Sequence, residues 1–325
     1  MSGRRKQVVV FRELPPDQLA RLQQVHDVTV ANPRMAGEKA AFDAALPGAQ
    51  GLIGSSYRID EAVLARAGRL EVISSISAGV DNYAVPALRA RGIVLCHTPD
   101  VLTETTADTI FALIMASSRR LVELANLVRD GHWTRNIGED LFGWDVHGKT
   151  LGILGFGRIG QALARRAALG FGMPVLYHSR QPVEVPGLAG NAEHTPLEDL
   201  LRRSDIVATA LPLTDETRGL MGAHEFAQMK AGAIFVNGSR GAIVQEPALL
   251  DALDRGTLRA AGLDVFATEP LPLDSPLRTH PKVTCLPHIG SATHETRHAM
   301  AELATSNLLL ALDGKPPMSV YSNVA

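Results

Sequence analysis

The hydrophobic positions of the chain gather into short uninterrupted runs separated by amphipathic segments. In the first hundred residues the runs are QVVVF, GLIG, LEVISS and GIVLC, and helical spacing is found between them in PPDQLARLQQV, GEKAAFDAAL and DEAVLARAG. Strands that are apolar throughout and alternate with helices are typical of a parallel sheet covered on both faces. The pattern predicts a first α/β unit.

A long helical pattern follows and leads into a second series of strands. TETTADTIFALIMASSRRLVELANLVRDGHW begins at Thr103 and has few helix breakers before Gly131, so we predict one helix that links two units. The strands then restart as TLGILG, MPVLYHS, DIVATAL, AIFVN, LRAAGLDV and KVTCLP. Six such strands suit a complete doubly wound dinucleotide-binding fold.

The last helix is expected to begin near Thr293 and to pack back onto the first unit, because it needs a partner. The predicted fold class is therefore α/β, with two Rossmann-like parallel-sheet domains. We expect a discontinuous, flavodoxin-like substrate domain at residues 1–102 and 291–325, and a dinucleotide-binding domain at residues 103–290.

Composition limits the classes of partner. With 325 residues, 46% hydrophobic and 20% charged, the chain is long enough for about two domains and a large core. A net charge of −2 provides no broad cationic face for nucleic acid or an anionic membrane. We expect small molecules and copies of the chain itself as partners.

Targeting signals and cysteines indicate a cytoplasmic protein. The apolar run near the N-terminus ends at Arg12 and Glu13, too early for a signal-peptide core, and no run reaches the roughly 18 apolar residues of a membrane span. Cys96 and Cys285 are too few for a zinc cluster, and we interpret them as core thiols.

A glycine-rich turn carries the first chemistry. In TLGILGFGRIGQALARR the glycines follow G-x-G-x-x-G spacing where a strand gives way to a helix. The first glycine permits the tight turn, the second lets a pyrophosphate approach the backbone, and the third lets helix and strand pack closely. The spacing alone is a weak signal, and a turn that merely packs is the alternative. The predicted cofactor-binding residues are Gly155, Gly157, Arg158, Ile159 and Gly160.

The end of the next strand indicates the type of dinucleotide. NAD enzymes usually place Asp or Glu there, about 20 residues after the glycines, on the ribose hydroxyls. This sequence reads VLYHSRQP, with Ser179 in place of the carboxylate and Arg180 beside it. A hydroxyl and a guanidinium favour a 2′-phosphate, so we predict NADP(H) as cofactor; a solvated arginine is the alternative.

Three reactive side chains follow later strands. Arg240 in VNGSRGAIV, Glu269 in GLDVFATEP and His288 in CLPHIGSAT each lie just beyond a predicted strand. Ligands of doubly wound folds collect at the carboxyl ends of strands, so these residues can converge. Arginine can clamp a carboxylate, imidazole can protonate a carbonyl oxygen, and Glu269 would hold the imidazole and favour its protonated form. Taken singly, each also fits a surface salt bridge or a structural histidine.

These motifs resemble those of the D-2-hydroxyacid dehydrogenase family over nearly the whole chain. The resemblance includes SAGVDNYAV, LTETTADTIFALIMASSRR, GKTLGILGFGRIG, LPLTDETRGL, NGSRGAIV, AAGLDVFATEP and LPHIGSATHETR. Within the family it is greatest to the bacterial 2-ketogluconate reductases, also called glyoxylate/hydroxypyruvate reductases. It implies an enzyme in which NADPH gives hydride to C2 of a 2-keto acid, His288 protonates the oxygen, and a D-2-hydroxy acid forms.

The resemblance also implies further site residues. Substrate would meet the backbone amides of Ala78 and Gly79, the Arg240 and His288 side chains, and Ser291. The cofactor would meet Thr106, Pro212, Thr217, Asp264 and Gly290 in addition to the glycine turn. Two positions before Arg240, this sequence has Gly238 where many members have a larger residue. This difference is expected to alter the surface that faces the nicotinamide and to leave Arg240 in register.

Two other functions remain open at this point. HETRH, residues 294–298, matches the zinc-peptidase pattern H-E-x-x-H, but the nearest later carboxylate, Glu302, is two helical turns from His294, roughly 12 Å along the axis. We therefore expect no metal. Some relatives of the family are dinucleotide-sensing transcriptional co-repressors that keep the triad, so a binding protein is the second alternative.

Aromatic residues indicate self-association. Trp133, Phe142 and Trp144 lie in the irregular stretch of residues 131–147, and exposed aromatics at such a place are typical of interfaces. In the family this region forms a dimerisation arm, so we expect a homodimer; ordinary packing under a loop is the alternative. The identity of the physiological 2-keto acid depends on loops such as GSSYRID, with Arg58, whose shape the sequence does not give.

Overall fold

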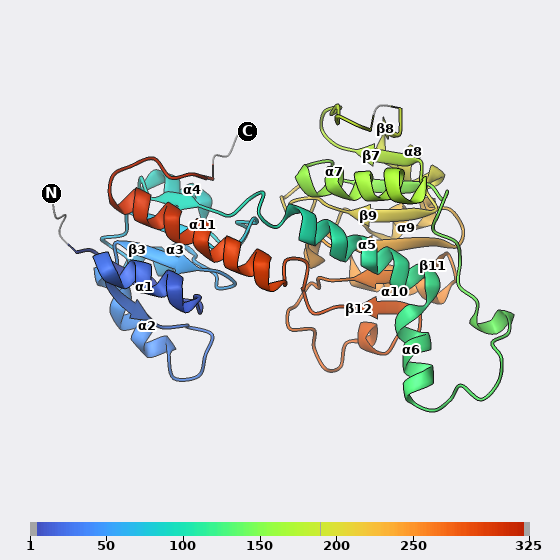
Figure 1. The fold of residues 1–325 in the computed structure, drawn as a ribbon, viewed down its shortest axis with the longest axis horizontal. Helices are drawn as coiled ribbons and strands as arrows, with labels where there is room; N and C mark the ends of the chain where they lie inside the picture. The colour runs from blue at the N-terminus through green and yellow to red at the C-terminus, as the bar shows by residue number, and fades with distance from the viewer. Residues whose placement is uncertain (1–4, 189, 322–325) are drawn as a thin grey trace. The chain divides into compact units, whose positions relative to one another are not determined.

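The computed structural model describes residues 5–188 and 190–321 (Figure 1). The chain divides into two compact units. The first contains the residues up to Leu102 and those from Ala292 onward, and the second runs from Thr103 to Ser291. Each unit has its own parallel sheet, so the predicted α/β fold class is confirmed.

The first unit has a five-stranded sheet in the order β2-β1-β3-β4-β5. All pairings are parallel, and this order is the flavodoxin-like one. Helix α11 packs against β3, β4, β5 and α1. The strands are β1 (Gln7–Val10), β2 (Asp27–Val30), β3 (Gly51–Gly54), β4 (Val72–Ser75) and β5 (Val94–Cys96), and the helices are α1 (Pro16–Val25), α2 (Lys39–Ala45), η1 (Leu46–Gly48), α3 (Glu61–Arg66), α4 (Val85–Ala90) and α11 (His294–Leu312).

The second unit has a seven-stranded parallel sheet in the order β12-β11-β10-β9-β6-β7-β8. The direction of winding reverses between β6 and β9, which is where doubly wound folds bind ligands. The strands are β6 (Leu151–Leu154), β7 (Val175–His178), β8 (Ala192–His194), β9 (Ile206–Thr209), β10 (Ala233–Asn237), β11 (Leu258–Leu263) and β12 (Val283–Cys285), and the helices are α5 (Thr103–Arg119), α6 (Leu121–Arg129), η2 (Glu139–Leu141), α7 (Arg158–Arg165), η3 (Arg166–Gly170), α8 (Leu197–Arg203), α9 (Ala223–Gln228), η4 (Gly241–Ile243), α10 (Glu246–Asp254) and η5 (Pro276–Arg278).

The prediction of a single linking helix is wrong. Two helices, α5 and α6, occupy this segment, and Arg120 between them has left-handed backbone geometry with φ 55° (Figure 1). The Arg120 side chain pairs with Glu123 at 2.6 Å and donates to the carbonyl of Asp140 at 2.6 Å. Because α5 is buried and α6 has no buried residue, the break separates a core helix from an exposed one.

Burial explains why the central strands form. β3, β4, β6, β9 and β10 are buried at every position, as expected for parallel strands covered on both faces. One apolar core fills the first unit, and two fill the opposite faces of the second sheet. No helix within the described residues is long and apolar enough to cross a membrane.

Candidate active site

Three neighbouring strands of the second sheet deliver the predicted reactive side chains. Arg240 follows β10, Glu269 follows β11 and His288 follows β12, and these strands are adjacent in the order β12-β11-β10. Neighbouring strands lie only about 4.8 Å apart. Residues separated by almost fifty positions in the sequence therefore leave the same edge of the sheet.

Glu269 and His288 are in direct contact. The Oε2 atom of Glu269 lies 2.7 Å from Nδ1 of His288, and its Oε1 atom accepts the backbone N–H of Phe266 at 3.0 Å. His288 has left-handed backbone geometry, with φ 54°. Strain of this kind in a residue other than glycine is often found at functional sites, and here it accompanies a histidine held by a carboxylate.

Electrostatics keep Glu269 ionised. Burial alone would raise the pKa of Glu269, but hydrogen bonds from His288 and from the Phe266 amide, together with the positive charges of His288 and Arg240, outweigh it and lower the pKa. The carboxylate is therefore negative at neutral pH. It can stabilise a protonated imidazole, which is the form that donates a proton.

A glycine allows the arginine loop to approach the glutamate loop. A Cβ atom on Gly241 would lie 1.8 Å from the carbonyl carbon of Phe266, so no other residue fits there without movement of the backbone. Arg240 precedes this glycine and donates from Nη1 to the Ser239 carbonyl at 2.8 Å. The close packing fixes the start of the Arg240 loop against the segment that leads to Glu269.

Asp264 organises the backbone after His288. Its two carboxylate oxygens accept the backbone N–H groups of Ile289 at 2.7 Å and Gly290 at 2.8 Å. Burial raises the pKa of Asp264 although these hydrogen bonds act to lower it. A Cβ atom on Gly290 would meet Asp264 at 3.2 Å and Thr106 at 3.4 Å, so these three predicted cofactor residues lie together.

The glycine turn after β6 has the geometry expected of a dinucleotide fingerprint. Gly155 has φ +94°, and a Cβ atom there would meet the Ala210 carbonyl oxygen at 2.6 Å. A Cβ atom on Gly160 would meet the Gly155 carbonyl oxygen at 2.2 Å. Gly157, at the N-cap of α7, has nothing within 4 Å of its Cβ position. The first and third glycines serve packing, and the second leaves open space for a phosphate.

Ser179 and Arg180 follow β7, next to the glycine turn. The Ser179 hydroxyl donates to the Gln181 carbonyl at 2.6 Å, and its own carbonyl lies 2.9 Å from Nε2 of His194. Arg180 is exposed. A hydrogen bond from Thr214 lowers the pKa of Glu216, and the positive charge of Arg180 adds to this effect. The predicted 2′-phosphate site thus follows β7, and His288 follows β12 at the opposite side of the sheet. Both lie at the carboxyl ends of the strands.

The remaining predicted residues of this unit lie along the same edge. Pro212 follows β9 and is exposed, and its carbonyl accepts the Thr217 hydroxyl at 2.7 Å. Arg158 and Ile159 form the first turn of α7. Ser291 comes directly after Gly290 and is partly buried.

Ala78 and Gly79 belong to the first unit and follow its strand β4. Side chains hold this loop: the Ser77 hydroxyl donates to the Gly79 carbonyl at 2.5 Å, and Nδ1 of His97 lies 3.0 Å from the Ala78 carbonyl. Within the described part of the chain, no acceptor is found for the backbone N–H of Ala78 or Gly79. Two such amides on a fixed loop can bind an anion.

Sequence reasoning missed Asn237, the last residue of β10. Its amide donates to the Arg240 carbonyl at 3.0 Å, and its Oδ1 accepts the Thr209 hydroxyl at 2.7 Å and the Ser239 backbone N–H at 3.1 Å. Asn237 is almost fully buried. A polar residue ending an otherwise apolar strand, three positions before the arginine, is the signal that could have identified it.

Gly238 and HETRH also have structural explanations. A Cβ atom on Gly238 would lie 2.3 Å from Cγ1 of Ile110, so Ile110 of α5 fills the space that a side chain at position 238 would need. His294 begins α11, whose N-cap is Thr293, and His298 pairs with Asp17 at 3.5 Å. Among described residues, no group of three or more His, Cys, Asp or Glu is arranged to hold a metal ion.

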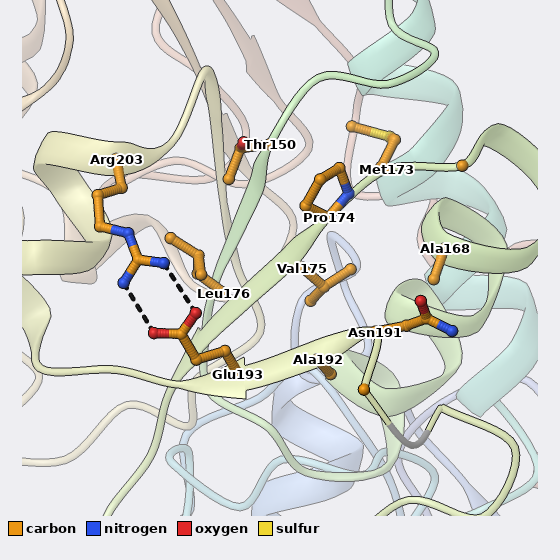
Figure 2. Close-up of a pocket in the computed structure, with 12 residues that line it drawn as sticks. Thr150, Ala168, Met173, Pro174, Val175, Leu176, Asn191, Ala192, Glu193 and Arg203 are labelled. Atoms are coloured by element: carbon orange, nitrogen blue, oxygen red, sulfur yellow. Dashed lines mark hydrogen bonds and ion pairs between the residues drawn. The ribbon is translucent and has the colours of Figure 1, made fainter.

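A cavity of about 360 Å³ lies at the amino ends of strands β6, β7 and β8 of the second sheet (Figure 2). Thr150 and Pro174, which precede β6 and β7, line it with Asn191, which precedes β8. Arg203 and Glu193 pair beside it at 2.7 Å (Figure 2). The candidate site lies at the carboxyl ends of these strands, so this cavity is not part of it.

The aromatic residues of the irregular stretch are exposed. Trp133 is 60% exposed, Phe142 50% and Trp144 40%, so these side chains do not pack in a core under the loop. The guanidinium of Arg259 lies 4.1 Å from the centre of the Trp144 ring. The adjoining helix α6 also exposes apolar side chains, including Leu121 and Val128.

Comparison with known proteins identifies the family. The family described as "D-isomer specific 2-hydroxyacid dehydrogenase, NAD binding domain" matches residues 111–290, more than half of the chain. The chain belongs to this family. The matched region contains Arg240, Glu269, His288 and the glycine turn, so the family assignment and the geometry concern the same part of the molecule.

Relatives in this dehydrogenase family match the chain almost from end to end. The "Glyoxylate/hydroxypyruvate reductase B" of Escherichia coli is 51% identical over 311 residues, 95% of each chain, and that of Escherichia fergusonii is 50% identical over 307 residues, 94% of this chain and 95% of the relative. The likeness thus includes both units.

Solved structures agree with this assignment. A Thermus thermophilus protein has a TM-score of 0.89 at 45% identity, covering 97% of this chain and all of the other. An NADPH-dependent glyoxylate/hydroxypyruvate reductase from Sinorhizobium meliloti, solved in complex with NADP and malonate, has a TM-score of 0.86 at 30% identity, covering 98% of this chain and 97% of the other.

Proposed function

We propose that this chain is an NADPH-dependent reductase of small 2-keto acids, which include glyoxylate, hydroxypyruvate and 2-ketogluconate, and that it forms D-2-hydroxy acids. The observation that carries the proposal is the ion pair between Glu269 and His288, with Arg240 close by, on adjacent strands of a dinucleotide-binding sheet. The names of the relatives at about 50% identity support glyoxylate and hydroxypyruvate as substrates.

Residues along the carboxyl edge fit a bound dinucleotide. The open space at Gly157 and the N-terminus of α7 suit the pyrophosphate, and Arg180 and Ser179 suit a 2′-phosphate. Asp264, Gly290 and Thr106 suit the nicotinamide end. When bound, the reduced cofactor supplies a hydride to the substrate carbonyl carbon.

The side chains of the second unit supply the remaining chemistry. Arg240 binds the substrate through a bidentate guanidinium contact. His288 donates a proton to the oxygen at C2, and Glu269 holds the imidazole by its Nδ1 atom so that Nε2 faces the substrate. Proton transfer by a positioned side chain of this kind contributes typically about 10²- to 10⁴-fold to the rate.

The first unit supplies the substrate-carboxylate loop. The backbone amides of Ala78 and Gly79 have no acceptor among the described residues, and a carboxylate would satisfy them. In this proposal, residues 1–102 and 291–325 form the substrate domain, and residues 103–290 form the dinucleotide-binding domain.

A panel of 2-keto acids tests this function. Glyoxylate, hydroxypyruvate and 2-ketogluconate are each assayed for kcat/KM with NADPH and with NADH. We expect turnover of at least one of them, with NADPH preferred. Tight cofactor binding without turnover of any substrate would instead indicate a dinucleotide sensor, and the reductase proposal would be rejected.

We also propose that the chain is a homodimer. An exposed apolar surface is formed by Trp133, Phe142 and Trp144 together with the apolar residues of α6. Apolar surface of this kind is typical of a protein interface. Sedimentation at micromolar protein concentration is expected to show a dimer, and Trp133→Ser to weaken it. A monomer at that concentration would contradict the proposal.

A further inference from the structure

A group of arginines lies at the carboxyl edge of the first sheet, outside the site described above. Arg12 follows β1 and donates from Nη1 to the hydroxyls of Ser55 and Ser56, at 3.0 Å for Ser56. Arg34 follows β2 and donates to the Ser56 carbonyl at 3.1 Å. The two guanidinium groups therefore meet at one serine, which follows β3.

A third arginine approaches the same place from another part of the sequence. Arg297 is the fourth residue of α11. Burial lowers the pKa of Arg12, and the positive charges of Arg297 and Arg34 lower it further. Like charges have been brought close together around a partly buried guanidinium.

This arrangement differs from that of Arg166, which is compensated by carboxylates. Arg166 pairs with Glu104 and Asp108 at 2.7 Å. Within the described ranges, no carboxylate forms an ion pair with Arg12 or Arg34. Arg12 is partly buried, whereas Arg34 is exposed. A partly buried charge is ordinarily compensated by an opposite charge, so the grouping of like charges around Arg12 is a signal of anion binding.

The backbone at this point is constrained. Ser56 has φ 63°, in the left-handed region that residues other than glycine rarely adopt. The preceding turn is packed closely, because a Cβ atom on Gly54 would lie 2.6 Å from the ring of Phe11. Packing of this kind holds Ser55 and Ser56 in place and preorganises the arginines that they contact.

The arginines lie on the same edge as the substrate-carboxylate loop. The sheet order places β3 between β1, which leads to Arg12, and β4, which leads to Ala78 and Gly79. Two strand spacings are about 10 Å. Glyoxylate is too short to extend from the loop to Arg12, whereas a sugar-acid chain, together with the length of the arginine side chain, spans this distance.

We propose that Arg12, Arg34 and Arg297 form a subsite for a second anionic group, a terminal phosphate or carboxylate, on a 2-keto acid whose own carboxylate lies at Ala78 and Gly79. The inference rests on the proposed reductase function and extends it to a substrate class. An anion there would relieve the repulsion between the guanidinium groups and accept their charge-assisted hydrogen bonds.

Matched substrate pairs test this subsite. 2-Ketogluconate is compared with its 6-phosphate, and 2-oxopentanoate with 2-oxoglutarate, so that each pair differs in the terminal anion; the first pair tests phosphate and the second carboxylate. In the unaltered protein, kcat/KM is expected to be at least about tenfold higher for the anionic member of one pair or both, mainly through a lower KM. Equal kcat/KM within both pairs would overturn the subsite.

Variants separate charge recognition from folding. Arg12→Gln is expected to remove most of the preference for the anionic member, and Arg12→Lys to keep part of it. Arg89→Gln, which removes an exposed charge on α4, serves as the matched control and should keep the original preference. Retention of the full preference in Arg12→Gln would also overturn the subsite.

Glyoxylate distinguishes the two proposals because it has no tail. If the unaltered protein reduces glyoxylate but shows no preference within either pair, the subsite is wrong and the reductase function stands. If it reduces none of these 2-keto acids, the reductase function itself fails, and the subsite fails with it.

Discussion

The carboxylate of Glu269 lies 2.7 Å from Nδ1 of His288, and its second oxygen is held by the Phe266 amide. The imidazole is therefore fixed at one nitrogen, and its other nitrogen is left for chemistry. A carboxylate in this position orients the ring and stabilises its protonated form.

Replacement of Glu269 by Gln tests that role. Glutamine keeps nearly the same shape but loses the negative charge, so the imidazolium is less stable and proton donation is slower. We expect kcat for glyoxylate reduction to fall by about 10²-fold or more. The loss of activity on the alkaline side of the pH–rate profile should also begin at lower pH, because a neutral imidazole does not donate the proton. Full activity with an unchanged profile would contradict a role for the Glu269 charge.

The same variant should show a pH-dependent difference in stability. Since the pKa of folded Glu269 lies below its ordinary value of 4.5, the carboxylate stabilises the fold above that value, and this contribution is lost as pH falls through the lowered pKa. The Tm of the unaltered protein is therefore expected to exceed that of Glu269→Gln at neutral pH, with the difference narrowing as the pH falls below the ordinary value of 4.5. A difference that grows with acidity would contradict this sign.

Gly241→Ala tests the contact between the arginine and glutamate loops. The added Cβ would lie 1.8 Å from the Phe266 carbonyl carbon, and one loop has to move. We expect destabilisation by about 1–3 kcal/mol and loss of most activity, measured by denaturant unfolding and steady-state kinetics. Gly68→Ala serves as the control, since Gly68, like Gly241, has no positive φ and, unlike Gly241, has no atom within 4 Å of its Cβ position.

Two glycines of the turn should respond differently to alanine. Gly157→Ala is expected to leave the Tm without cofactor nearly unchanged, because its Cβ meets no protein atom within 4 Å, but to weaken NADPH binding by calorimetry. Gly160→Ala should lower the Tm itself, because its Cβ would meet the Gly155 carbonyl oxygen at 2.2 Å. Unchanged NADPH affinity in Gly157→Ala would show that the open space at Gly157 is not a phosphate site.

Arg180→Ala tests the cofactor preference. Removal of the guanidinium should raise the KM for NADPH by about tenfold or more and change the KM for NADH little, because only NADPH carries the 2′-phosphate. Arg202→Ala, which removes an exposed arginine paired with Asp199, is the control. An unchanged NADPH KM in Arg180→Ala would refute the assignment.

The sequence predicts the buried strands and the edge strands β5 and β12, but it misses the two other edge strands. β3, β4, β6 and β10 are buried throughout and were identified, whereas β2 and β8 were not. Both missed strands are at sheet edges and carry exposed residues, so no uninterrupted apolar run marks them. The break between α5 and α6 was also missed, because Arg120 adopts left-handed geometry without the glycine or proline that usually signals it.

The candidate site could be predicted in its parts but not in its arrangement. Strand ends gave Arg240, Glu269 and His288, but the sequence does not show that β10, β11 and β12 are neighbours. The supporting roles of Asn237 and Gly241 depend on three-dimensional contacts. The contacts of Arg12 and Arg34 with Ser56 also depend on the three-dimensional fold, because they join segments that follow separate strands.

The most direct test of the central claim is a rapid-mixing measurement of NADPH oxidation by glyoxylate in a single turnover, with the unaltered protein and His288→Gln. The account predicts rapid oxidation by the unaltered protein. It predicts that His288→Gln still binds NADPH but oxidises it at least about 10²-fold more slowly. Equal rates in the two proteins, or bound NADPH that the unaltered protein does not oxidise with any 2-keto acid, would contradict the account.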